Sequence, residues 1–116
     1  MPATLQQLQS RLSDARNPAA WRWQARRTLG DVRDLLTAES QASDDGWLAA
    51  RGAGMLRERD ALLERLAALG PRVFREPGLE GVRADVRRLL VDVEHHLQRR
   101  RDLVWDEVEL ELGGSE

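Results

Sequence analysis

The chain has 116 residues, which is enough for one core and too few for two domains of ordinary size. Hydrophobic residues make up 41% and charged residues 33%, a globular balance, and the absence of cysteine excludes disulfides, thiolate catalysis and cysteine-based metal sites. All 18 basic residues are arginines, but the net charge is −2 and acids are interleaved among them, which argues against a nucleic-acid surface.

Residues 1–17 predict a short N-terminal amphipathic helix. Thr4 and Gln7 have the spacing of a capping box, and leucines follow at intervals of three and four residues. Asn17 and Pro18 then favour the start of a second helix, with asparagine as the N-cap and proline at the first helical position.

Three longer helices are expected over residues 18–40, 44–69 and 79–113, because apolar residues recur along each at the helical interval. The stretch 70–78 (GPRVFREPG) predicts an interhelical loop, since its two prolines interrupt a helix. Short turns between such helices predict an all-α fold. We expect a single domain, residues 1–116, in which three long antiparallel helices and the short N-terminal helix form a bundle.

The only two histidines, His95 and His96, lie in the middle of the last helix. Adjacent helical residues point about 100° apart, so at most one of them faces the core. His96 lies at the edge of the apolar stripe that contains Leu89 and Val93, whereas His95 points to the opposite side. His96 is therefore a candidate metal ligand. Because the other helices supply no histidine, we favour a hydrogen-bonded histidine at the core boundary.

Charged residues on the apolar faces of the helices predict an internal polar network. A buried unpaired charge costs several kcal/mol, so inward arginines and glutamates should pair. The expected members are Glu39, Arg59, His96, Arg100 and Glu107. The alternative is that Arg59 buries only its stem and reaches solvent from a thin bundle, and the sequence favours neither interpretation over the other.

Two segments carry a resemblance to a known family. The start of the second helix (AAWRWQARRTLGDVRDLL) and the end of the last (HHLQRRRDLVWDEVELELGG) resemble small actinobacterial proteins related to hemerythrin-like bundles, and the resemblance spans residues 21–114. It implies a helical bundle that holds a non-haem di-iron centre through histidines and carboxylates. Here Glu39 and Arg59 stand where inward histidines are expected, and an arginine cannot ligate a cation. We therefore expect a metal-free relative without a cofactor. The alternative is an iron-binding protein that senses or stores iron, oxygen or nitric oxide.

Large apolar residues outside the main stripes predict an interaction surface. Trp105, Val108 and Leu112 share a flank of the last helix, and Trp23 points away from the apolar stripe of its own helix. The short first helix could cover that flank. Alternatively, a second copy of the chain or another protein covers it.

The sequence contains no nucleophile elbow and no phosphate-binding loop, so we expect no enzymatic activity. It has no apolar run of the roughly 20 residues that a membrane span needs, and its N-terminus lacks the pattern of a secretory signal. We expect a small cytoplasmic, non-catalytic scaffold or interaction module whose partner is another protein or a second copy. A third interpretation is contact with RNA through Arg99, Arg100 and Arg101, which point in different directions around the helix.

Overall fold

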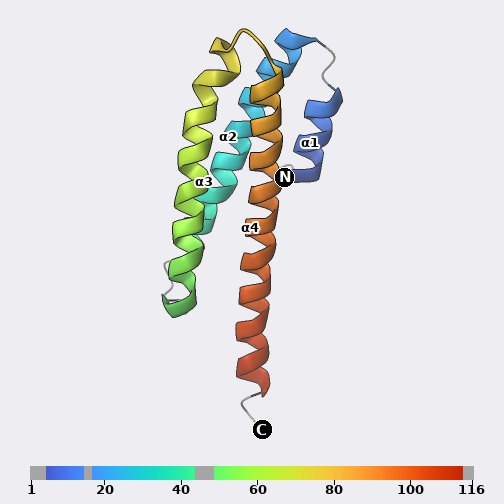
Figure 1. Cartoon of the computed structure of the whole chain (residues 1–116). Helices are drawn as coiled ribbons and strands as arrows, with labels where there is room; N and C mark the ends of the chain where they lie inside the picture. Colours follow the sequence, from blue (N-terminus) through green and yellow to red (C-terminus); the bar gives the residue numbers. More distant parts are fainter. Residues whose placement is uncertain (1–4, 15–16, 44–48, 114–116) are drawn as a thin grey trace.

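The computed structural model describes residues 5–14, 17–43 and 49–113, and within them the side chains of residues 5–13, 17–38 and 54–103. Four helices and no strand occur in these ranges: α1 (Leu5–Asp14), α2 (Pro18–Ser43), α3 (Ala49–Arg75) and α4 (Glu80–Gly113). Successive helices run in opposite directions, and α4 extends past the ends of α2 and α3 (Figure 1). The expected all-α bundle of three long antiparallel helices and a short N-terminal one is confirmed.

The start of α2 follows the predicted capping chemistry. The side-chain oxygen of Asn17 accepts a 2.8 Å hydrogen bond from the Ala20 amide, and its main-chain carbonyl accepts a 2.9 Å bond from the Trp21 amide. Two features of the sequence thus fix this helix end: an N-cap that satisfies an otherwise unpaired amide, and Pro18 at a position where no N–H is needed.

The core lies along the line where the helices meet, and it consists almost entirely of leucine and valine. The apolar stripes predicted for α2 and α4 are buried, which confirms the helical periodicity as the main determinant of this fold. The buried hydrophobic residues are Leu8, Leu12, Trp21, Ala25, Leu29, Val32, Leu36, Leu62, Leu66, Leu69, Val73, Val82, Val86, Leu89, Leu90 and Val93.

The four helices pack around this core so that α1 and α3 each contact both α2 and α4. Because α1 has only 10 residues and α4 has 34, α1 covers its side of the bundle over a fraction of the length. Leu8 and Leu12 are the buried anchors of α1. α1 is therefore the shortest wall of the bundle.

α3 is longer than the sequence predicts. Residues 70–75, expected within the loop 70–78, belong to α3, so that only residues 76–79 connect it to α4. A proline inside a helix costs about 3 kcal/mol, so the cost of Pro71 must be offset by other contacts. One is the burial of Val73, whose side chain is fully enclosed in the core.

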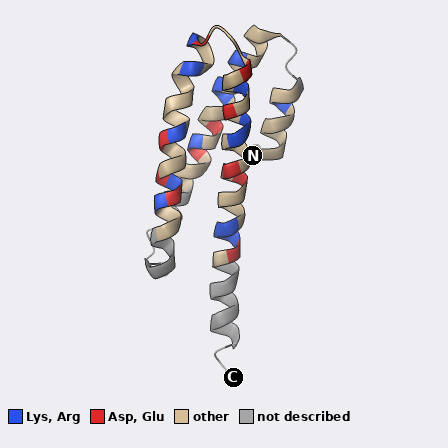
Figure 2. Ribbon diagram, in the orientation of Figure 1, with Lys and Arg blue, Asp and Glu red and all other residues tan. Residues whose placement is uncertain are grey.

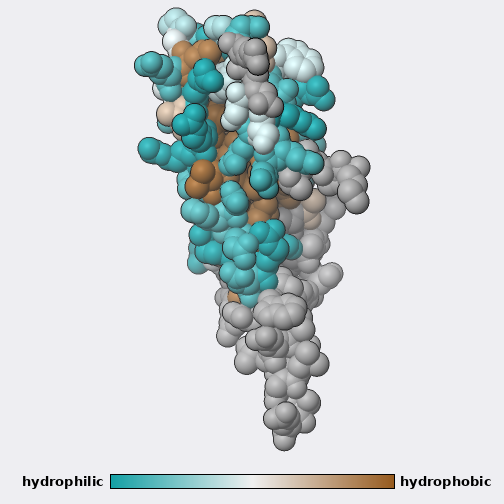
Figure 3. Space-filling model, turned by 90° about the vertical axis from the view of Figure 1, so that its right-hand side faces the viewer, coloured by the Kyte–Doolittle hydropathy of each residue, from teal (hydrophilic) through white to brown (hydrophobic). Residues whose placement is uncertain are grey.

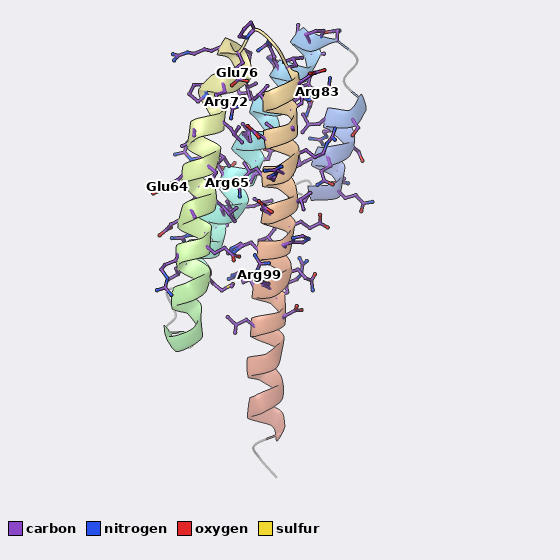
Figure 4. The ribbon with its side chains drawn as sticks, viewed as in Figure 1. Glu64, Arg65, Arg72, Glu76, Arg83 and Arg99 are labelled. Atoms are coloured by element: carbon purple, nitrogen blue, oxygen red, sulfur yellow. The ribbon has the colours of Figure 1, made fainter. Side chains whose placement is uncertain are left out.

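Arg22 of α2 and Arg72 of α3 hold this end of α3 in place. Arg22 donates from Nη1 to the Val73 carbonyl at 2.6 Å and from Nη2 to the Glu76 carbonyl at 2.7 Å, and so caps carbonyls that have no partner within the helix. Arg72 donates to Glu76 at 2.5 Å and to Asp85 of α4 at 2.8 Å (Figure 4). The hydrogen bond to Glu76, and then the one to Asp85, raise the pKa of Arg72 above its ordinary value. These tertiary contacts explain why the helix continues through Gly70 and Pro71.

Acidic and basic residues are interspersed along the described parts of α2, α3 and α4 (Figure 2). Among the described residues, no helix is both long enough and apolar enough to cross a membrane.

Candidate functional site

His96 lies at the centre of a polar contact between α3 and α4. Its side chain is 0% exposed, and its Nδ1 is 2.5 Å from Oε1 of Glu58. The same carboxylate oxygen lies 2.8 Å from Nη2 of Arg99, which follows His96 by one helical turn on α4 (Figure 4). The favoured prediction for His96, a hydrogen-bonded residue, matches this placement, although its burial is complete and not partial.

The carboxylate of Glu58 is electrostatically adapted to this position. Partial burial works to raise its pKa, but the hydrogen bonds from Arg99 and His96, together with the positive charges behind them, outweigh that effect. The net result is a pKa below the ordinary value of 4.5, so Glu58 is ionised at neutral pH. We call Glu58, His96 and Arg99 the α3–α4 polar cluster.

Arg59, another predicted member of the network, has a different partner. Arg59 is 13% exposed, and its Nη2 pairs at 2.9 Å with the neighbouring Asp60, not with His96. Its Nη1 is buried without a hydrogen-bond partner among the described residues. Arg100 is half-buried. Glu39 and Glu107 fall in the stretches whose side chains are not described. The carboxylate that the described structure places on His96 is therefore Glu58.

Glu58 was not among the residues predicted from the sequence, but a signal for it exists. The buried Leu62 and Leu66 are four residues apart, and one further step of four toward the N-terminus reaches Glu58. Arg59 lies three residues before Leu62, on the other edge of the same stripe. Both residues therefore border the apolar face, and sequence alone gives no register between α3 and α4 that would select one of them.

The candidate metal ligand His96 uses Nδ1 in the contact with Glu58. In the described part of the chain, no three histidine, aspartate or glutamate side chains gather closely enough to hold a metal ion. The polar cluster joins α3 and α4 through the contacts of Glu58 with His96 and Arg99.

A second group of side chains lies on the outside of α2 and α3. Trp23 is 59% exposed and Phe74 is 46% exposed, which sets them apart from Trp21, whose exposure is 3%. Each ring forms a cation–π contact with an arginine. The guanidinium of Arg27 lies 5.0 Å from the Trp23 ring centre, and that of Arg26 lies 5.7 Å from the Phe74 ring centre.

These contacts join the two rings into one surface. Residues 23, 26 and 27 are neighbours on the face of α2 because they are three and four positions apart. Arg26 then reaches across to Phe74 near the end of α3. We call Trp23, Arg26, Arg27 and Phe74 the aromatic–arginine patch. Of the predicted interaction residues, Trp23 belongs to it, whereas Trp105, Val108 and Leu112 lie outside the described side chains.

No protein-family model, curated protein or solved structure matches the chain. The hemerythrin-like resemblance thus stays a prediction from the two sequence segments that carry it.

Proposed function

We propose that the chain is a non-catalytic helical interaction module that binds an acidic segment of a partner protein at the aromatic–arginine patch. The observation that carries this proposal is the exposure of Trp23 and Phe74 beneath two arginines. Tryptophan and arginine are among the residues most enriched at the positions that dominate binding energy in protein interfaces.

The chemistry of the patch favours a carboxylate-bearing partner. A guanidinium held over an aromatic face keeps its N–H donors available at the ring edge, and a carboxylate can accept two of them at once. Within the described part of the chain, neither Arg26 nor Arg27 forms an ion pair. An acidic segment with an apolar residue would satisfy both the free donors and the exposed rings.

The placement of the other polar groups supports a role without catalysis. His96 is buried against Glu58, and Arg72, Glu76 and Asp85 are engaged with one another at the turn between α3 and α4. These groups contribute to the packing of the helices. The patch, by contrast, exposes the rings of Trp23 on α2 and Phe74 on α3 to solvent.

The proposal can be tested by photo-crosslinking in cells that express the protein. A photoreactive amino acid at position 23 should give a discrete crosslinked product, identified by mass spectrometry, and the product should be lost when Arg26 and Arg27 are both changed to glutamate. A crosslink to an acidic segment of another protein supports the proposal, and a crosslink to a second copy of the chain identifies the partner as the chain itself.

The matched control places the same photoreactive residue at position 84, because Ala84 is an exposed residue on α4 and lies outside the patch. Position 84 should give none of the product seen at position 23. Equal crosslinking at both positions, or a product at position 23 that survives the two charge reversals, would overturn the proposal.

A further inference from the structure

A groove of about 310 Å³ lies where α1 meets α2 and α4. This volume is at the lower end of the range of about 300–1,000 Å³ that is typical of small-molecule sites. The apolar part of its wall includes Leu12, Trp21 and Leu90, and the polar part includes Gln9, Arg83 and Arg87. Figure 3, which looks onto the side of the molecule where α1 lies, shows hydrophobic residues between hydrophilic ones.

The charge along this groove is of one sign. Arg83 and Arg87 are one helical turn apart on α4, and among the side chains that the structure describes no acidic residue contributes to the groove wall. The guanidinium of Arg83 lies 5.6 Å from the ring centre of Trp21 (Figure 4). Among the described residues, neither Arg83 nor Arg87 forms an ion pair.

We propose that this groove is a binding site for a small amphipathic carboxylate, with the carboxylate on Arg83 and Arg87 and the apolar part of the molecule against Val91, the exposed apolar residue of the groove wall. The groove wall has an apolar part and a cationic part, so it favours a ligand that carries both an apolar group and a negative charge. A purely polar anion would make no use of the exposed Val91 side chain, and a neutral hydrocarbon would form no ion pair with either guanidinium.

The position of α1 gives this site its shape. Gln9 and Leu12 of α1 form one wall, and Arg83, Arg87 and Leu90 of α4 form another. The groove shares no residue with the aromatic–arginine patch. The inference is therefore independent of the proposed function.

Calorimetric titration with octanoate tests the proposal. The comparison ligands are 1-octanol and octylamine, which keep the alkyl group of octanoate and replace its negative charge with no charge and a positive charge. We expect octanoate to bind at least about tenfold more tightly than 1-octanol, which is the effect of one charge-assisted hydrogen bond, and octylamine not to bind. Substitution Arg87→Gln should weaken octanoate binding by about the same factor and leave 1-octanol unaffected.

Two further variants separate the groove from the rest of the surface. Arg88→Gln makes the same change of charge at the next residue of α4, which does not line the groove, and should bind octanoate as the unmodified protein does. Ser13→Trp fills the groove from an exposed position on α1 and should abolish binding. Circular dichroism checks that each variant keeps its helix content.

The proposal is overturned if octanoate does not bind up to its solubility limit, or if 1-octanol binds as tightly. Equal losses in Arg87→Gln and Arg88→Gln would also overturn it, since they would indicate a general effect of net charge.

Discussion

Glu58 of α3 and His96 of α4 are joined by a 2.5 Å contact between Oε1 and Nδ1. Because an ionised carboxylate can only accept hydrogen bonds, the proton in this contact is carried by Nδ1. The pair also specifies how α3 and α4 align. A shift of α4 along α3 would move a fully buried imidazole away from its carboxylate and into an apolar surrounding, which is costly for a polar group.

Removal of this carboxylate should therefore destabilise the bundle. We expect Glu58→Ala to lower the free energy of unfolding by about 1.5–3 kcal/mol, the usual range for a hydrogen bond to a charged group. The measurement is urea-induced unfolding followed by circular dichroism. Glu64→Ala is the matched control, because Glu64 is an exposed glutamate on the same helix (Figure 4), and its effect should stay within about 0.5 kcal/mol. Similar losses in both variants would contradict the role given to Glu58.

The same pair predicts how stability depends on pH. The pKa of Glu58 is lower in the folded protein than its ordinary value of 4.5. A group whose pKa is depressed by folding stabilises the fold fully above its unfolded pKa, and this contribution is lost as the pH falls through the folded pKa. We expect the free energy of unfolding to decline below about pH 4.5, and to decline less steeply in Glu58→Gln. The test is a pH series of urea unfolding curves for both proteins. If the two pH profiles are parallel, Glu58 is not the group responsible.

The parts of the fold that could be predicted from the sequence are those that depend on neighbouring residues. The buried stripe of α2 from Trp21 to Leu36 follows from periodicity, and the N-cap at Asn17 follows from local hydrogen bonding. The outward direction of Trp23 follows from the same periodicity, because a residue two positions after a buried one lies on a different face.

The parts that could not be predicted depend on contacts between distant segments. Glu58 and His96 are 38 residues apart, and their pairing requires the register of α3 on α4, which no local pattern contains. The predicted end of α3 was wrong for the same reason. Gly70 and Pro71 predict a helix stop, but Arg22, from a helix far earlier in the chain, caps the carbonyl of Val73 and stabilises the longer helix.

Gly30 offers a stabilising substitution. It lies inside α2 on an exposed face, and a Cβ atom placed there meets no other atom within 4 Å. Because alanine restricts the unfolded chain and favours the helix, Gly30→Ala should raise the free energy of unfolding by about 0.5–1 kcal/mol. The measurement is thermal or urea unfolding. Gly30→Pro is the opposite control and should cost about 3 kcal/mol, since it removes a helical hydrogen bond. A loss of stability in the alanine variant would contradict the open environment described for Gly30.

Arg22 should be the residue on which the last turn of α3 depends most. Its two donors cap the carbonyls of Val73 and Glu76 at 2.6 and 2.7 Å, next to a proline that weakens the helix. We expect Arg22→Ala to lower the free energy of unfolding by about 1.5–3 kcal/mol and to increase amide hydrogen exchange selectively in residues 72–76, because the unfolding begins where the cap is lost.

Arg22→Lys should recover only part of the stability, since a single ammonium cannot reproduce the two fixed donors of a guanidinium. Arg33→Ala removes an exposed arginine from the same helix, and its effect should stay within about 0.5 kcal/mol. If Arg22→Ala leaves exchange in residues 72–76 unchanged, burial of Val73 alone must hold α3 through Pro71, and the cap is not the reason that the helix extends.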